Sequence, residues 1–215
     1  MIMINRFYDN LDKYLIPGKV LVIFGPRQVG KTTLLNHYLG QSKLRYRFET
    51  GSNVKVQESL GVPDLEILKQ YVEGYQLLVV DEAQQIPNIG QSLKLLVDQM
   101  PEIIVIVIGS ASFELAGQIG EHLTGRKRTI MMYPVSQLEL SLNQNQSKLK
   151  DHLPDHLIYG SYPAVLTAKS QQAKKDVLDE IVGSYLFKDI LDFDRVKSSK
   201  IILNMLRLVA FQVGS

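Results

Sequence analysis

The sequence contains no cysteine among its 215 residues. This absence excludes a disulfide framework and any metal site built from thiolates. Because a chain without cysteine suits a reducing compartment, we expect a cytoplasmic protein. Hydrophobic residues make up 45% of the chain, which is enough for the packed core of one fair-sized domain or of one domain with a small appendage.

Long apolar segments are also missing. The longest uninterrupted run, residues 103–108, falls far short of the roughly 20 residues that a membrane helix needs. The first ten residues, MIMINRFYDN, contain no basic leader, no long apolar stretch and no small-residue cleavage site. We therefore expect neither a membrane span nor a signal peptide.

Neither sign of charge predominates, since 24 Lys and Arg residues face 22 Asp and Glu residues. This balance does not indicate a nucleic-acid-binding protein, although a local basic patch stays open. Arg45 with Arg47 and Lys174 with Lys175 are candidates for such a patch. Ordinary solvated charges are the plainer interpretation of both pairs.

What the chain does contain is a regular alternation of strand and helix patterns. Five segments have the composition of strands, three of them apolar enough for burial on both faces: 20–24, 46–49, 77–80, 103–108 and 129–133. Four segments have helical spacing: 4–15, 32–39 (ended by Gly40), 63–72 and 89–100. The alternation predicts an α/β fold, a parallel sheet with helices on both faces.

The polar stretch NQNQS at 143–147 is the predicted domain boundary, dividing an α/β domain (1–145) from a wholly helical region (146–215). An apolar stripe along residues 201–209 needs a partner surface. Either this stripe folds back on the helix predicted at 174–191, or the sequence is truncated and the partner surface lies in the missing segment.

Residues 25–32, GPRQVGKT, match the eight-position P-loop (Walker A) pattern and lie between a predicted strand and a predicted helix, as the pattern requires. Gly25 and Gly30 let the backbone curl, so that successive N–H groups form an anion site at a helix N-terminus. Lys31 is predicted to reach the β- and γ-phosphates of ATP, and the Thr32 hydroxyl to ligate Mg²⁺.

The rest of the loop completes the predicted nucleotide site: Pro26, Arg27, Gln28, Val29 and the second hydroxyl, Thr33. The Arg27 side chain either contacts a phosphate or a neighbouring carboxylate, or is merely solvated.

Two carboxylates follow the predicted strand at 77–80. Asp81 is the candidate for the Mg²⁺ shell (Walker B), and Glu82 for the base that activates the attacking water. Adjacent acids after a strand also occur simply as helix-initiating residues. The upstream P-loop favours the catalytic interpretation.

The strand at 103–108 ends in Gly109-Ser110-Ala111-Ser112. Ser110 is the candidate to hold the lytic water or the γ-phosphate, and a helix N-cap at Ser110 or Ser112 is the alternative. His152 and His156 have the i, i+4 spacing of metal ligands. Pro154 between them disfavours a regular helix, so we expect no metal site there.

Together, the P-loop and the segments VVDEAQ, IGSAS, LTGRKR and YPVSQLEL occur in an order that resembles predicted prokaryotic AAA-superfamily ATPases. These are similar to the archaeal-type ATPases and the signal-transducing switch ATPases, and typically carry a C-terminal domain of unknown function. The resemblance covers nearly the whole chain. It implies a P-loop sheet with an additional strand, that of Ser110, between the strands of Val20 and Val79, followed by a helical lid.

Three residue roles follow from the resemblance alone. Ser110 resembles the sensor position. Arg126 matches an arginine near the subunit edge, which as a finger acts on phosphate from a neighbouring subunit or after a conformational change; a surface basic trio at 126–128 is the alternative. Pro163, in the GSYP turn at 160–163, would lie near adenine, although the tetrapeptide alone is only a turn signal.

The leading interpretation is an ATPase that couples hydrolysis to conformational change in a partner domain. A nucleotide-loaded switch with negligible turnover, a small-molecule kinase and a nucleic-acid remodeller are the alternatives, and Glu82 argues for turnover. Family members continue past Gly214 into a winged-helix-like unit, so the resemblance implies truncation here. We expect self-association or a protein partner through the C-terminal region.

Overall fold

The computed structural model describes residues 4–110, 121–142, 144–186 and 199–212. The chain packs as two compact units, Met1–Pro163 and Ala164–Ser215. This division by contacts does not test the domain boundary predicted at 145/146, which stays a prediction. Among the described residues, none of the helices combines the length and apolar character that crossing a membrane would require.

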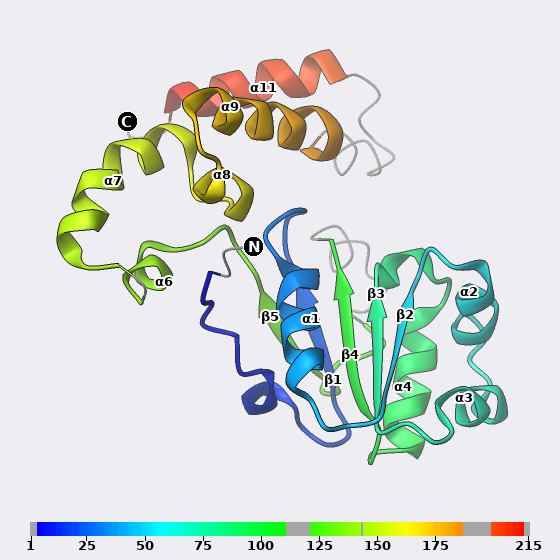
Figure 1. Ribbon diagram of the computed structural model, residues 1–215. Helices are drawn as coiled ribbons and strands as arrows, with labels where there is room; N and C mark the ends of the chain where they lie inside the picture. Colours follow the sequence, from blue (N-terminus) through cyan, green and yellow to red (C-terminus); the bar gives the residue numbers. More distant parts are fainter. Residues whose placement is uncertain (1–3, 111–120, 143, 187–198, 213–215) are drawn as a thin grey trace. The chain divides into compact units, whose positions relative to one another are not determined.

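A five-stranded parallel sheet forms the centre of the first unit (Figure 1). Its order is β2-β3-β4-β1-β5, and the strands are β1 (Val20–Phe24), β2 (Tyr46–Thr50), β3 (Leu77–Asp81), β4 (Ile104–Gly109) and β5 (Lys127–Met131). The parallel α/β fold is therefore confirmed. So is the additional strand, because β4 lies between β1 and β3.

Helices cover both faces of this sheet, as the alternation of patterns predicts (Figure 1). The 3-10 turn η1 (Leu11–Tyr14) and helix α1 (Lys31–Gln41) pack on one face, where Leu35 and Tyr38 meet Ile23 and Ile106. The opposite face packs against α2 (Val54–Leu60), α3 (Leu65–Val72) and α4 (Ile89–Gln99). The β-branched residues of β1, β3 and β4 are consequently buried from both sides.

The helix predicted at 4–15 is wrong over most of its length, because only Leu11–Tyr14 forms a helical turn. The backbone N–H of Arg6 donates to Oδ2 of Asp9 (2.9 Å), and the N–H of Asp9 donates to the carbonyl of Arg6 (3.2 Å). These two bonds close a tight turn over 6–9, and the Arg6 side chain is buried. Buried Leu11 then anchors the following 3-10 turn.

Other element bounds differ by smaller amounts. Helix α1 continues through Gly40 to Gln41, helix α2 was not predicted, and β5 begins two residues earlier than expected. Helix α7 (Gln146–Tyr159) runs through Pro154, so the reason given against a helix between His152 and His156 is wrong. Within this helix, His156 Nδ1 lies 2.9 Å from Nε2 of Gln137 on the short helix α6 (Gln137–Ser141).

The second unit is helical in its described part, as predicted. It contains most of α8 (Pro163–Thr167), then α9 (Gln171–Glu180), the π-helical turn η3 (Ile181–Leu186) and α11 (Ser199–Gln212). On α11 the apolar stripe remains uncovered by the described residues, since Ile201, Met205 and Leu208 are 65–67% exposed.

Two glycines allow the packing to be tested with a matched pair of alanine variants. Gly40 lies inside α1, where an added Cβ would have nothing within 4 Å, so Gly40→Ala is expected to stabilise the protein by about 0.5–1 kcal/mol. Gly51 follows β2, and a Cβ there would lie 2.2 Å from the carbonyl oxygen of Glu82. Gly51→Ala is expected to destabilise it by about 1–3 kcal/mol.

Urea unfolding followed by circular dichroism measures both changes. Equal destabilisation by the two variants would contradict the helix through Gly40.

Candidate nucleotide site

Register places three groups of candidate residues at one edge of the sheet. In the parallel ladder Phe24 of β1 is opposite Gly109 of β4, and Val80 of β3 is opposite Val107. Because parallel strands end at the same edge, the loops after β1, β3 and β4 leave the sheet side by side. The P-loop, Asp81 and Ser110 begin at these three strand ends.

The P-loop has the backbone that its glycines permit. Gly30 has a φ of 98°, in the left-handed region, and it is the N-cap of α1. Gln28 also has a positive φ, 62°. The loop therefore curls just before the helix, and the first N–H groups of α1 are available to an anion.

Lys31 folds over this loop. Its Nζ donates to the carbonyl oxygens of Gly25 (2.8 Å) and Pro26 (2.9 Å). A positive charge thus stands directly beside the curled backbone, where a phosphate would meet it.

Thr32 and Asp81 are brought together from opposite sides of the additional strand. The Thr32 hydroxyl donates to Oδ2 of Asp81 at 3.0 Å, and Oδ1 of Asp81 accepts from the backbone N–H of Glu82 at 2.8 Å. A hydroxyl and a carboxylate this close form a pair of hard oxygen ligands. This contact joins residues 49 positions apart in the sequence.

Glu82 stands in a strained conformation, with φ 49° and ψ 41° in the left-handed region. Such backbone is costly for a residue other than glycine and is found preferentially at functional sites. The Glu82 carboxylate accepts a short hydrogen bond from Nε2 of Gln84, two residues on. Gln84 was not predicted, although it belongs to the VVDEAQ segment.

Ser110 lies directly after β4 and is only 4% exposed. It is thus at the correct edge of the sheet for the predicted contact. Ser112, the other candidate N-cap, lies outside the described residues. Thr33 is exposed on the first turn of α1.

Arg126 is not brought to the phosphate edge. It directly precedes β5, and its carbonyl accepts from the backbone N–H of Val20, the first residue of β1. Both positions mark the amino-terminal edge of the sheet, opposite the P-loop. The guanidinium pairs there with Asp98 at the end of α4. A role as a finger within the same P-loop does not fit this placement, and a role towards a neighbouring subunit stays a prediction.

Pro163 lies close to the P-loop, because a Cβ added to Gly30 would be 3.9 Å from Cγ of Pro163. The preceding Tyr162 packs against the core on the α1 face of the sheet. The predicted contact with adenine stays a prediction.

The sequence profile of a family described as "AAA domain" matches residues 17–141. The chain belongs to this AAA domain family. A second profile, "Domain of unknown function (DUF8612)", matches residues 150–215. The expected combination of an AAA-type P-loop domain and a C-terminal domain of unknown function is therefore confirmed.

Curated relatives of this AAA domain protein are themselves uncharacterized. A Mycobacterium tuberculosis protein is 30% identical over 182 residues, covering 84% of this chain and 38% of the relative. A Methanocaldococcus jannaschii protein is 23% identical over 224 residues (95% and 49%). A Haemophilus influenzae protein is 24% identical over 237 residues (100% and 56%). The chain spans about half the length of these relatives or less.

Two solved structures show a distant likeness. A Candida albicans Pif1 helicase has 13% identity and a TM-score of 0.44, covering 72% of this chain and 44% of the helicase. The flagellar accessory protein FlaH of Methanocaldococcus jannaschii has 13% identity and a TM-score of 0.38, covering 60% of this chain and 78% of FlaH.

Sequence reasoning missed a buried polar network beside the P-loop of the AAA domain. The Arg6 guanidinium donates to the Val29 carbonyl (2.8 Å), the Tyr133 carbonyl (2.6 Å) and Oε1 of Glu139 (2.9 Å). The S-x-x-E pattern of Ser136 and Glu139 signals the capping box that begins α6, and the structure contains this box. Nothing local signals that the same carboxylate also binds Arg6.

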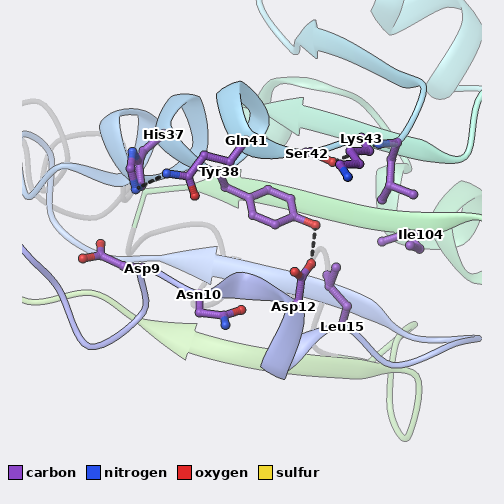
Figure 2. Close-up of a pocket in the computed structure, with 11 residues that line it drawn as sticks. Asp9, Asn10, Asp12, Leu15, His37, Tyr38, Gln41, Ser42, Lys43 and Ile104 are labelled. Carbon is purple, nitrogen blue, oxygen red and sulfur yellow. Dashed lines mark hydrogen bonds between the residues drawn. The ribbon is translucent and has the colours of Figure 1, made fainter.

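A separate pocket of about 750 Å³ lies away from the phosphate edge (Figure 2). Residues of the N-terminal segment, of the end of α1 and of the following loop line it, and Ile104, the first residue of β4, places it towards the amino-terminal edge. Here Tyr38 donates to Oδ1 of Asp12 at 2.8 Å. Burial, followed by this bond to Asp12, raises the pKa of Tyr38 to about 12.

The Glu139 carboxyl is expected to make stability depend on pH. Burial alone would raise its pKa, but hydrogen bonds from the N–H groups of Ser136 and Phe7 and from Arg6 outweigh burial and hold the pKa below its ordinary value. The stabilisation is therefore complete above the unfolded pKa of about 4.3 and is lost as the pH falls through the folded pKa.

We expect Glu139→Gln to be about 1–3 kcal/mol less stable than the parent at pH 7, with a gap that narrows below about pH 4.5. Urea unfolding at a series of pH values measures this gap. Glu66→Gln, on an exposed carboxylate paired with Lys69, is the control and should stay within about 0.5 kcal/mol throughout. A Glu139→Gln gap unchanged down to pH 3 would contradict the pKa direction.

Proposed function

We propose that this chain binds Mg-ATP at residues 25–33 and hydrolyses it, with Glu82 as the base. The observation that carries the proposal is the 3.0 Å contact between the Thr32 hydroxyl and the Asp81 carboxylate beside a curled P-loop. This contact joins the two sequence motifs that P-loop ATPases use for the metal and the phosphates. Membership of the AAA domain family supports it.

The donor set fits a magnesium ion, because a hydroxyl and a carboxylate are the hard oxygen ligands that Mg²⁺ prefers. Thr32 and Asp81 would hold it. When bound with nucleotide, Mg²⁺ neutralises negative charge on the phosphate oxygens.

The chain's own groups divide the remaining work. The curled backbone of residues 25–30 and the first N–H groups of α1 bind phosphate oxygens. Lys31 exchanges its contacts with the Gly25 and Pro26 carbonyls for the β- and γ-phosphates. Glu82 accepts a proton from the attacking water, and Ser110 orients that water or the γ-phosphate.

We further propose that hydrolysis changes the conformation of a partner domain reached through residues 146–215. Two facts support this: the curated relatives are about twice as long as this chain, and the apolar stripe of α11 is exposed. Self-association would give Arg126 a phosphate in a neighbouring copy.

Nucleotide affinity and Mg-ATP turnover, measured on the same samples, test the proposal. Glu82→Gln should keep the affinity and lower kcat about 10²–10⁴-fold, since it removes the base. Lys31→Ala should weaken binding about 10–100-fold, the value of a charge-assisted contact. Glu66→Gln, on the remote helix α3, is the control and should match the parent. If the parent bound ATP tightly but showed no turnover, the proposal that this chain hydrolyses ATP on its own would be wrong.

A nucleotide-loaded switch with negligible turnover is the second candidate. The hydrogen bond from Gln84 to the Glu82 carboxylate favours it, because a carboxylate oxygen that already accepts from the amide is less available to the attacking water.

Gln84→Ala separates the two candidates. If the amide restrains Glu82, turnover should rise about threefold to tenfold at unchanged ATP affinity, of the order expected from losing one hydrogen bond of about 1 kcal/mol. Lower turnover in Gln84→Ala would instead indicate that the amide orients Glu82 for catalysis.

A further inference from the structure

We propose that Arg6 is a positioning residue of the P-loop, which holds the peptide between Val29 and Gly30 in its phosphate-binding orientation. The importance of that orientation for nucleotide rests on the proposed function. Arg6 itself lies 19 residues before the loop begins and belongs to none of the recognised motifs.

The first step of the argument is the contact itself. Nη1 of Arg6 donates to the Val29 carbonyl at 2.8 Å in buried surroundings. In a trans peptide the C=O and the following N–H point in opposite directions. Fixing the Val29 carbonyl towards Arg6 therefore directs the N–H of Gly30 to the opposite side of the peptide.

The second step is that this peptide needs an external restraint. Gly30 has a φ of 98°, and glycine distributes itself over more backbone conformations than any other residue. Within the part of the chain that the structure describes, the atoms nearest to a Cβ at Gly30 would be Cγ of Pro163 (3.9 Å) and Nη1 of Arg6 (4.0 Å), each near the limit of contact. Packing by these residues alone therefore does little to fix the peptide.

The third step is that Arg6 is itself rigid. Its side chain is only 7% exposed, and its other donors bind the Tyr133 carbonyl and the Glu139 carboxylate. That carboxylate also accepts from the N–H groups of Phe7 and Ser136. Two charges buried together with their hydrogen bonds satisfied resist movement, because separating them leaves an uncompensated charge.

The network thus ties the P-loop to the N-terminal segment and to the first turn of α6. A rotation of the P-loop peptide on binding phosphate would alter the contact between Arg6 and Glu139. A displacement of α6 would, through the same contact, alter the hydrogen bond from Arg6 to the P-loop. Arg6 touches neither Glu82 nor Asp81 in the described contacts, so it should affect binding rather than the chemical step.

Arg6→Met tests this role, because methionine keeps much of the buried volume and removes every donor. We expect hydrogen exchange of the backbone amides of residues 27–33 to accelerate about tenfold in the nucleotide-free protein. The Kd for Mg-ATP should rise about tenfold, with kcat within about twofold of the parent. For Arg6→Lys, which can supply one direct donor, the exchange rate and the Kd should lie between those of the parent and those of Arg6→Met.

The double variant Arg6→Met/Glu139→Gln separates positioning from stability. It removes both buried charges, so stability should recover relative to Arg6→Met, whereas affinity and P-loop exchange should stay impaired. If Arg6→Met fails to fold, the double variant supplies the same comparison.

Arg47→Met is the matched control. Like Arg6, Arg47 combines a carboxylate with backbone carbonyl contact, here Glu49 (2.6 Å) and one carbonyl, that of Tyr71 (2.8 Å), but it lies on edge strand β2. It should leave P-loop exchange and Mg-ATP affinity unchanged.

Parent-like P-loop exchange in Arg6→Met, or equal acceleration in Arg47→Met, would overturn the inference. Absence of Mg-ATP binding by the parent would instead overturn the proposed function, and the exchange experiment would still decide the role of Arg6.

Discussion

The parallel register of β3, β4 and β1 is the constraint from which the candidate site follows. These strands carry their β-branched residues into cores on both faces, so a slip in register would cost buried packing on two sides at once. With the register fixed, the chain leaves the sheet at Gly25, Asp81 and Ser110 along one edge. Thr32 needs only the first turn of α1 to reach Asp81, so the contact is a consequence of where the strands end.

Strands and helices with strong periodicity were predictable from the sequence, because burial on one or two faces determines where apolar residues recur. The bounds of β1 were predicted without error, and those of β3 and α4 to within one residue. Periodicity carries no information about strand order, however, and the place of β4 was implied only by resemblance. The failure at residues 4–15 has a similar cause, since a side chain–backbone turn and a buried arginine override helical spacing.

The site divides in the same way. Residues within motifs were identifiable because phosphate chemistry demands particular types at fixed spacing, as at Lys31 and Thr32. Arg6 and Glu139 lie 133 positions apart, and the sequence around each explains it separately, as a solvated cation and as a helix-capping residue. Their pairing depends on the tertiary fold, which the local sequence does not reveal. Arg126 illustrates the converse, because a motif match could not reveal that it would pair with Asp98 at the opposite edge.

Gly25 is pressed against the chain that leaves β5, since a Cβ there would lie 2.0 Å from the carbonyl oxygen of Met132. Any side chain would wedge the sheet open between its last two strands before it met a ligand. Glycine is thus required at this position for two reasons, the close contact with the chain after β5 and the space that a phosphate needs. Replacing Gly25 would disturb both the packing of the sheet and the binding of phosphate. Loss of nucleotide binding in such a variant would therefore not show which of the two had failed. Lys31, whose side chain only overlies the loop, is the cleaner position at which to disable binding.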